Sequence, residues 1–307
     1  MNYRHAYHAG NFGDVLKHVV LMLCLEHLKR KETGFRVIDT HAGAGRYRLD
    51  HDAAAKTDEW RHGIGRLFGP DAVPLPAAVA TVLKSYLAAL QSENPLGSLT
   101  IYPGSPALVQ AALRPSDALQ ANELHPDDAA ILRNVLAKDK LCKVTNSDGY
   151  AALKAAVPPR ERRGLILIDP PFEQPGELVR MTKSLAEAVK RFATGIYVLW
   201  YPIKDEKPVT RFHRGIQEVT EAAGLRPALK VELLLRPLRN PLLLNGAGVV
   251  IVNPPFQLAA ELAALMPFLA KTLGDDGKGL FRLAELTTVV DAGPPSRTEL
   301  AGRKAQH

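Results

Sequence analysis

Short apolar segments alternate with helical segments along most of this 307-residue chain. The clearest apolar segment, Leu-Ile-Leu-Ile at 165–168, has no polar face. Such a strand is buried on both sides, as in a parallel sheet that helices cover on both faces, so we expect an α/β fold. The expected strands are 35–38, 118–122, 143–146, 165–168, 195–200, 229–235 and 248–252, and the expected helices are 14–31, 77–90, 105–113, 127–137, 150–156, 177–192 and 209–223.

Four acidic residues stand at or just past the ends of predicted strands. They are Asp39, Glu123, Asp148 and Asp169. In parallel α/β sheets the ligand lies outside the carboxyl ends of the strands. We therefore expect these acids to meet at one edge of the sheet and to mark a ligand site.

The α/β rhythm stops between residues 46 and 100. This stretch is rich in glycine and proline and contains one good helical segment, 77–90. We predict an α/β domain formed by 1–45 and 101–287, a helical subdomain inserted at 46–100, and a loose tail at 288–307.

The composition is that of a soluble globular protein, with 46% hydrophobic and 23% charged residues. The net charge of +7 is concentrated in 1–35, which carries +2, and in 177–240, which carries +5. A basic balance favours polyanionic partners such as nucleic acid. Two cysteines, a polar amino terminus and the absence of a run of about 20 apolar residues predict a cytoplasmic protein without disulfides or membrane spans.

A glycine loop follows the first predicted strand. In Asp39-x-x-x-Gly43-x-Gly45 the glycines let backbone N–H groups approach a ligand. The dinucleotide pattern requires a third glycine where Arg48 stands, so the loop fits S-adenosylmethionine enzymes better than dehydrogenases. A plain glycine turn is the alternative. Glu123 follows the next strand about 20 residues after Gly104, a position that suits ribose binding, although it can also cap the following helix.

The sequence Asp169-Pro170-Pro171-Phe172 after strand 165–168 has a specific chemical use. The exocyclic nitrogen of adenine is a poor nucleophile because its lone pair is delocalised into the ring. A carboxylate and the Pro170 carbonyl can accept its two N–H groups and turn the lone pair toward an electrophilic methyl, while the Phe172 ring stacks on the base. A rigid Pro-Pro turn without chemistry is the alternative.

A second copy, Asn253-Pro254-Pro255-Phe256, also follows an apolar strand. One sheet with one glycine loop has room for one catalytic turn. The first copy continues the series of glycine loop, ribose acid and adenine acid, whereas the second lies at the far end of the sheet. We therefore interpret Asn253 as structural.

Together these motifs resemble the RlmJ-type 23S rRNA adenine-N6 methyltransferases, in family order and from residue 2 to about 270. The matching segments are YRHAYHAGN (3–11), DVLKH (14–18), DTHAGAGRY (39–47), YPGSP (102–106), ELHP (123–126), RRGLILIDPPF (162–172) and LWYP (199–202). The family pattern has tyrosine where this chain has Phe172. Stacking on the base survives that change, whereas a phenol hydrogen bond is lost.

The resemblance implies a Rossmann-like methyltransferase sheet with a helical insertion, and Asp169 as the catalytic acceptor. It further implies Tyr3 near the target nucleotide and Lys17 close to the site. The contacts to S-adenosylmethionine that it implies are His18, His41, Ser105, Glu123, Asp148 and Gly149. The glycine loop adds Gly43 and Gly45 to this expected set, and Asp169 completes it.

The expected function is methylation of adenine N6 in 23S rRNA of a protein-poor or immature large subunit, by a monomer that needs no metal. A DNA adenine-N6 methyltransferase and a non-catalytic, ribosome-associated RNA-binding protein are the alternatives. The residues expected to contact substrate RNA are Tyr3, Arg4, Lys17, Lys204, Lys207 and Arg211.

Overall fold

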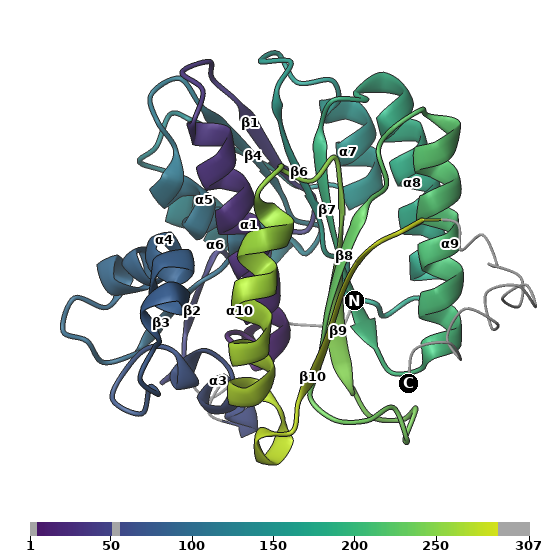
Figure 1. Cartoon of the computed structure of the whole chain (residues 1–307). Helices are drawn as coiled ribbons and strands as arrows, with labels where there is room; N and C mark the ends of the chain where they lie inside the picture. The colour runs from purple at the N-terminus through teal and green to yellow at the C-terminus, as the bar shows by residue number, and fades with distance from the viewer. Residues whose placement is uncertain (1–4, 51–55, 288–307) are drawn as a thin grey trace, which may run out of the picture.

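A central sheet of eight strands organises the computed structural model, which describes residues 5–50 and 56–287 (Figure 1). All seven predicted strands are present, with their ends within a few residues of the expected positions. In spatial order the strands are β10 (Leu280–Glu285), β8 (Leu229–Leu234), β9 (Gly246–Val252), β7 (Ile196–Ile203), β6 (Gly164–Ile168), β1 (Arg36–Asp39), β4 (Ala118–Asn122) and β5 (Cys142–Thr145).

The sheet is parallel only in part, which corrects the expectation of a wholly parallel sheet. The strands β5, β4, β1, β6 and β7 run parallel to one another. In contrast, β9 is antiparallel to both of its neighbours, β7 and β8, and β10 is antiparallel to β8. The structure also adds an eighth strand, β10, that is not among the predicted strands. Only two of the six residues of β10 are even partly covered, and its segment lacks the continuous apolar run that marks a buried strand.

Helices cover both faces of the sheet, and the Rossmann-like α/β fold is confirmed. On one face Val37, Leu165 and Leu167 point into a core with one set of helices, while Ile38, Ile166 and Ile168 point into a second core. This alternation is the period of a strand buried on both sides. The first set is α1 (Phe12–Lys29), α5 (Ser105–Ala112), α6 (Pro126–Leu136) and α10 (Leu258–Leu273), and the second is α7 (Gly149–Ala156), α8 (Glu177–Arg191) and α9 (Glu206–Ala222).

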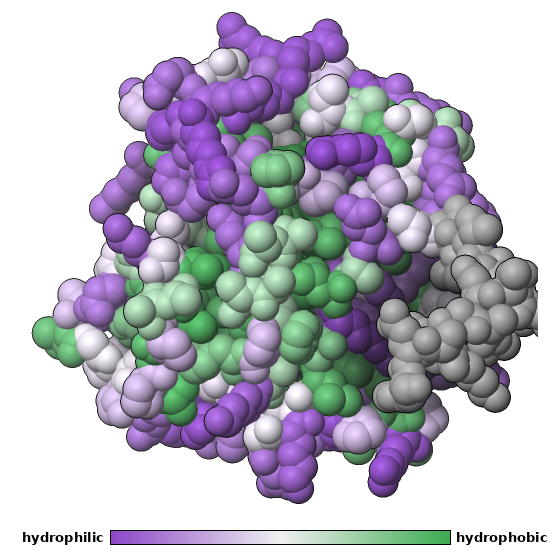
Figure 2. All heavy atoms as spheres, in the orientation of Figure 1, coloured by the Kyte–Doolittle hydropathy of each residue, from purple (hydrophilic) through white to green (hydrophobic). Residues whose placement is uncertain are grey.

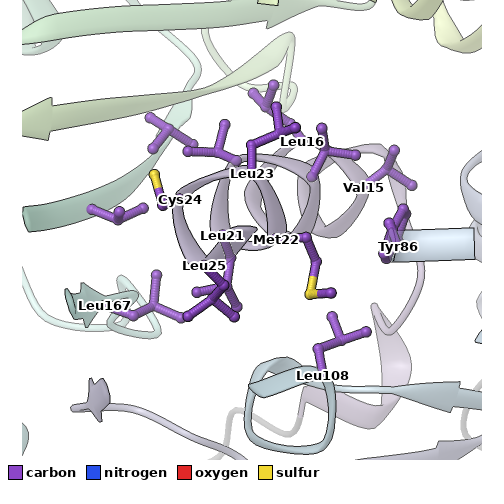
Figure 3. Close-up of a cluster of buried hydrophobic side chains, with 14 of the residues drawn as sticks. Val15, Leu16, Leu21, Met22, Leu23, Cys24, Leu25, Tyr86, Leu108 and Leu167 are labelled. Atoms are coloured by element: carbon purple, nitrogen blue, oxygen red, sulfur yellow. The ribbon is translucent and has the colours of Figure 1, made fainter. Parts of the chain in front are cut away.

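Helix α1 is buried on nearly every side, and its apolar side chains radiate around the whole axis (Figure 3). Cys24 and Leu25 lie on the side of the strand residue Leu167, while Met22 points between Tyr86 and Leu108. A helix enclosed in this way holds the residues of its first turns in fixed positions relative to the sheet. The Asn11 side chain caps it by accepting hydrogen bonds from two backbone N–H groups of the first turn.

The stretch 46–100 contains β2 (Arg46–Arg48), α3 (Glu59–His62) and α4 (Ala77–Glu93). Strand β2 pairs in antiparallel fashion with β3 (Ile101–Pro103), which lies beyond the predicted end of the insertion. Helix α4 packs on α1 and α10 within the same core. Apolar side chains gather on the outer face of α10 and beside it (Figure 2). The domain boundaries themselves stay a prediction, and the tail 288–307 lies outside the described residues.

Short 3₁₀ segments complete the described chain at η1 (His5–Tyr7), η2 (Ile64–Arg66) and η3 (Asp275–Gly277). Within residues 5–50 and 56–287, none of the helices combines the length and apolar character that crossing a membrane requires.

Candidate active site

A pocket of about 450 Å³ opens where the parallel strands end. Loops that follow β1, β4, β5 and β6 bring His41, Glu123, Asp148 and Asp169 to its wall, and η1 and α1 close the other side. The expected meeting of acids at one edge of the sheet is thus confirmed for three of the four. The fourth, Asp39, is fully buried and does not line the pocket.

The glycine loop is joined directly to the acid after β4. The Gly43 N–H donates to Glu123 Oε2 at 2.8 Å, and the His125 N–H donates to Glu123 Oε1 at 2.8 Å. Burial raises the pKa of Glu123 despite these hydrogen bonds. Gly43 has a φ of +62° and lines the pocket, whereas Gly45 is not among the lining residues. Gly45 instead packs against Leu132 of α6, so its place in the fold explains it without a cofactor contact.

Asp39 does not line the pocket itself but is hydrogen-bonded to a residue that does. Its Oδ2 accepts a hydrogen bond from Ser105 Oγ at 2.7 Å, and Ser105 lines the pocket at the start of α5. Burial raises the pKa of Asp39 to about 6. A buried carboxyl of this kind orients the serine hydroxyl that faces the pocket.

His41 and Gly149 touch across the pocket wall. A Cβ at Gly149 would lie 2.4 Å from His41 Nε2 and 2.8 Å from the Thr40 carbonyl oxygen, so only glycine fits there. Asp148 precedes it as the N-cap of α7 and accepts hydrogen bonds from the Tyr150 and Ala151 N–H groups. Burial lowers the pKa of His41 to about 4, so the imidazole is neutral at pH 7.

The low pKa of His41 predicts a pH dependence of stability. The unfolded chain binds a proton on this residue below about pH 6.5, whereas the folded chain does so only near pH 4. Stability is therefore lost as the pH falls between these values, and His41→Gln is expected to flatten the slope by up to one proton. Urea unfolding of both proteins at pH 7, 6 and 5 measures this slope. Equal slopes would show that folded His41 titrates normally.

His18 lies in α1 with its ring stacked on Tyr102. Its Nδ1 is 2.7 Å from the Tyr102 hydroxyl, while its buried Nε2 has no hydrogen-bond partner within the described chain. Burial and the nearby Lys17 ammonium hold the pKa of His18 well below its usual range. A neutral imidazole with one free ring nitrogen beside a pocket has the capacity to bind a polar ligand group.

Asp169 is joined to the amino-terminal part of α1 by a buried chain of charges. Lys17 Nζ lies 2.5 Å from Asp169 Oδ2 and 2.8 Å from Asp14 Oδ1. Asp14 Oδ2 in turn lies 2.8 Å from His5 Nε2 and accepts the Gly10 N–H. The two carboxylates raise the pKa of Lys17 well above its usual value although burial opposes them, so the ammonium is charged.

Lys17 lines the pocket, so it lies close to the site as the resemblance implies, while its contact with substrate RNA stays a prediction. Its side chain is only 5% exposed and is held between two carboxylates. The sequence shows Lys17 one turn after Asp14, a spacing that allows such a pair, but the approach of Asp169 depends on the packing of α1 against β6.

Pro170 and Phe172 line the same pocket beside Asp169. Phe172 has a φ of +54°, an unfavourable backbone conformation for a residue with a side chain. Its ring meets the Trp200 ring edge to face, with centroids 5.7 Å apart. Strained conformations of this kind persist where the surroundings impose them, and they cluster at functional sites.

The second Pro-Pro-Phe sequence lies at the opposite edge of the sheet. Because β9 is antiparallel to β7, its last residue, Val252, pairs with Tyr197 near the start of β7. Asn253 Nδ2 donates to the carbonyl oxygens of Ala193 and Gly195, both at 2.8 Å. These contacts support a structural role for Asn253, as the sequence predicts.

The remaining predicted RNA contacts divide into two groups. Lys204 lines the pocket and also an adjoining groove of about 740 Å³, in which Lys207 and Arg211 stand on the first turns of α9. Tyr3 and Arg4 lie outside the described residues.

Several residues of the site carry no assigned role in the sequence interpretation. His5 and Asp14 belong to the buried chain of charges, and Trp200 supports Phe172. Glu59 of α3 accepts a hydrogen bond from Asn11 and contacts His8, which attaches the stretch 46–100 to the amino-terminal arm. His5, Asp14 and Trp200 lie in the sequence segments that match the family, and this is the signal that could have identified them. Glu59 lies outside those segments, and only the packing identifies it. In the described part of the chain, no group of three or more histidine, cysteine or acidic residues is arranged to hold a metal.

Comparisons with known proteins identify the family. The family model described as ribosomal RNA large subunit methyltransferase D, RlmJ, matches residues 32–287. Ribosomal RNA large subunit methyltransferase J of Haemophilus influenzae is 42% identical over 288 residues, which cover 94% of this chain and 99% of that protein. The protein of the same name from Escherichia coli is 40% identical over 279 residues, which cover 91% and 96%.

A solved structure shows the same fold. The crystal structure of protein LPL1258 from Legionella pneumophila is 30% identical, with a TM-score of 0.81, and the match covers 91% of this chain and 98% of that one. The sequence matches and this structure agree over nearly the whole chain. The protein therefore belongs to the RlmJ family of ribosomal RNA large subunit methyltransferases.

Proposed function

We propose that this protein transfers a methyl group from S-adenosylmethionine to N6 of an adenine in 23S rRNA. The observation that carries the proposal is the position of Asp169, Pro170 and Phe172 in the same pocket as the glycine loop and Glu123. Family membership supports a ribosomal RNA substrate, since both curated relatives bear that activity in their names.

The pocket suits S-adenosylmethionine in size and in chemistry. Its volume lies in the range of small-molecule sites. Gly149 leaves no Cβ at the wall, and the free Nε2 of His18 lies at a buried position beside it. The residues that would hold the cofactor are His18, His41, Gly43, Ser105, Glu123, Asp148 and Gly149. When bound, S-adenosylmethionine supplies an electrophilic methyl group.

The residues of the catalytic turn act on the target base. Asp169 and the Pro170 carbonyl accept the two N6 hydrogens and thereby orient the nitrogen lone pair, while Phe172 stacks on the adenine ring. Attack of the nitrogen on the methyl group leaves the nitrogen positively charged. Its N–H groups thereby become more acidic, and one proton is transferred to Asp169. Lys17 holds the Asp169 carboxylate in place before the reaction, through the ion pair at 2.5 Å.

Labelled cofactor tests the proposal directly. Methyl incorporation is measured on a 23S transcript and on duplex DNA, and mass mapping then locates the modified adenine. Incorporation into DNA alone would favour a DNA adenine methyltransferase. Calorimetry separates the non-catalytic alternative, because a protein that only binds RNA has no affinity for S-adenosylmethionine.

We expect Lys204, Lys207 and Arg211 to hold RNA phosphates, because all three are exposed at the groove beside the pocket. Reversing their charge to glutamate is expected to weaken RNA binding and to reduce the slope of log K against log salt by about 2, since each lost phosphate contact removes about 0.7. Binding titrations at several salt concentrations measure this slope.

The control reverses three exposed lysines elsewhere, with the same change in net charge. They are Lys84 on α4, and Lys138 and Lys140 beyond α6. An equal loss of slope in the control would show that only the net charge matters. An unchanged slope in the groove variant would show that Lys204, Lys207 and Arg211 do not contact RNA phosphates.

A further inference from the structure

The turn between β8 and β9 presents two adjacent leucines to solvent. Leu242 is 85% exposed and Leu243 is 46% exposed. Single exposed apolar residues are common and need no explanation. Two adjacent exposed leucines at the tip of one turn, next to the mouth of a candidate active site, do require an explanation.

The turn is held firmly in place. Asn240 Oδ1 accepts the Leu242 N–H at 3.0 Å, and Asn240 O accepts a hydrogen bond from Asn245 Nδ2 at 2.7 Å. The same Asn245 Nδ2 also donates to the Lys204 carbonyl at 3.0 Å, and Asn245 is fully buried. The exposed leucines therefore stand on an ordered support that is tied to the strand leading to α9.

The turn also lies between the pocket and the adjoining groove. Leu244 lines the pocket, Leu238 and Pro241 line the groove, and Lys204 lines both. A polynucleotide that places one base in the pocket and continues along the groove therefore passes the tip of this turn.

Positively charged side chains line the groove beside the turn, and Arg239 belongs to the turn itself. Lys204, Lys207, Arg211 and Arg239 are exposed, and within the described residues none of them forms an ion pair. Of the two acids in the groove, Asp205 caps α9 and Glu206 pairs with Arg282. An apolar tip with a cationic rim fits a nucleic acid, whose phosphates contact the rim while the tip meets the bases.

We propose that Leu242 is a wedge that enters the base stack of the RNA next to the target adenosine and keeps that adenosine in the pocket. This inference rests on the proposed function. Enzymes that modify a base must take it out of the stack, and apolar side chains inserted between neighbouring bases are one means of separating them.

Fluorescence of 2-aminopurine at the target position tests the wedge, because this base brightens when it leaves the stack. On a hairpin RNA, Leu242→Ala is expected to lose most of the brightening seen with the wild type, and to lower kcat/KM for the adenine hairpin by about tenfold or more. On a short unstructured RNA with the same central sequence, the rate is expected to be close to that of the wild type, because little stacking remains to be broken.

Leu96→Ala is the matched control, since Leu96 is 93% exposed in the stretch 46–100 and lies outside both the pocket and the groove. If Leu242→Ala brightened 2-aminopurine as much as the wild type does, the wedge would be overturned and the proposed methyl transfer would be unaffected. Absence of methyl transfer by the wild type would instead overturn the proposed function. Loss of binding to anionic vesicles by Leu242→Ala, with unchanged RNA readouts, would assign the turn to a membrane surface and also overturn the wedge.

Discussion

Asp169→Ala is expected to lower the rate of methyl transfer by a factor of about 10²–10⁴, the range typical of a lost proton acceptor. The alanine variant can neither orient the target nitrogen nor accept its proton. Lys17 keeps its second partner, Asp14, at 2.8 Å, so the variant retains a paired ammonium and is expected to fold. Single-turnover rates with labelled S-adenosylmethionine measure the effect.

The second Pro-Pro-Phe sequence supplies the control. Asn253→Ala changes the matching position of the same local motif at the opposite edge of the sheet. It is expected to leave the rate of transfer unchanged and to reduce stability by about 1–3 kcal/mol, because two carbonyl oxygens lose their donor. A wild-type rate for a folded Asp169→Ala variant would remove the catalytic role of the turn.

Lys17→Met is expected to destabilise the protein by about 3–5 kcal/mol and to abolish most activity. The substitution leaves two carboxylates, Asp14 and Asp169, without their shared cation in a site where Asp14 is almost fully buried. Urea unfolding at pH 7 measures the loss. In Asp14→Asn/Lys17→Met one of these charges is also removed, so we expect stability to recover in part and activity to stay low.

Lys29→Met is the matched control on the same helix. Lys29 pairs with Glu26 at 2.9 Å with the same spacing of three residues, but its side chain is 30% exposed. A pair in contact with water contributes at most about 1 kcal/mol, so the control is expected to be nearly neutral. Equal losses in the two variants would contradict the importance of burial at Lys17.

The pKa values of Asp14 and Lys17 determine the pH range over which their ion pair stabilises the protein. The pKa of Asp14 lies well below its usual value because His5 and Lys17 are near, so this stabilisation is present above about pH 4 and is lost as the pH falls through the lowered pKa. The pKa of Lys17 is raised, so its contribution is present below about pH 10.5 and is lost as the pH rises through the raised pKa. The stability difference between wild type and Lys17→Met is therefore expected to be largest between these limits.

Local chemistry explains why much of the fold and site could be predicted from the sequence. The apolar run of β6 can be satisfied only by burial on both faces, and the residues after parallel strands must meet at one edge. This reasoning alone places Glu123, Asp148 and Asp169 around one pocket. The resemblance added the histidines, which no spacing rule identifies.

Three features depended on contacts between distant segments. The direction of β9 follows from its pairing with β7 and β8, and it carries Asn253 away from the pocket. The environment of Lys17 follows from the packing of α1 against the sheet, which makes this lysine a buried partner of Asp169. Strand β10 forms because β8 offers it an edge, since its own apolar pattern is weak.

The sequence by itself determined the α/β class, the edge of the sheet that holds the pocket, and the Asp-Pro-Pro-Phe turn that lines it, because each depends on residues close together in the chain. Only the tertiary structure decided which charges are buried and which are exposed beside the pocket. Burial and strand direction are properties of the assembled sheet and helices, and the energy of a charge depends on those surroundings more than on its neighbours in sequence.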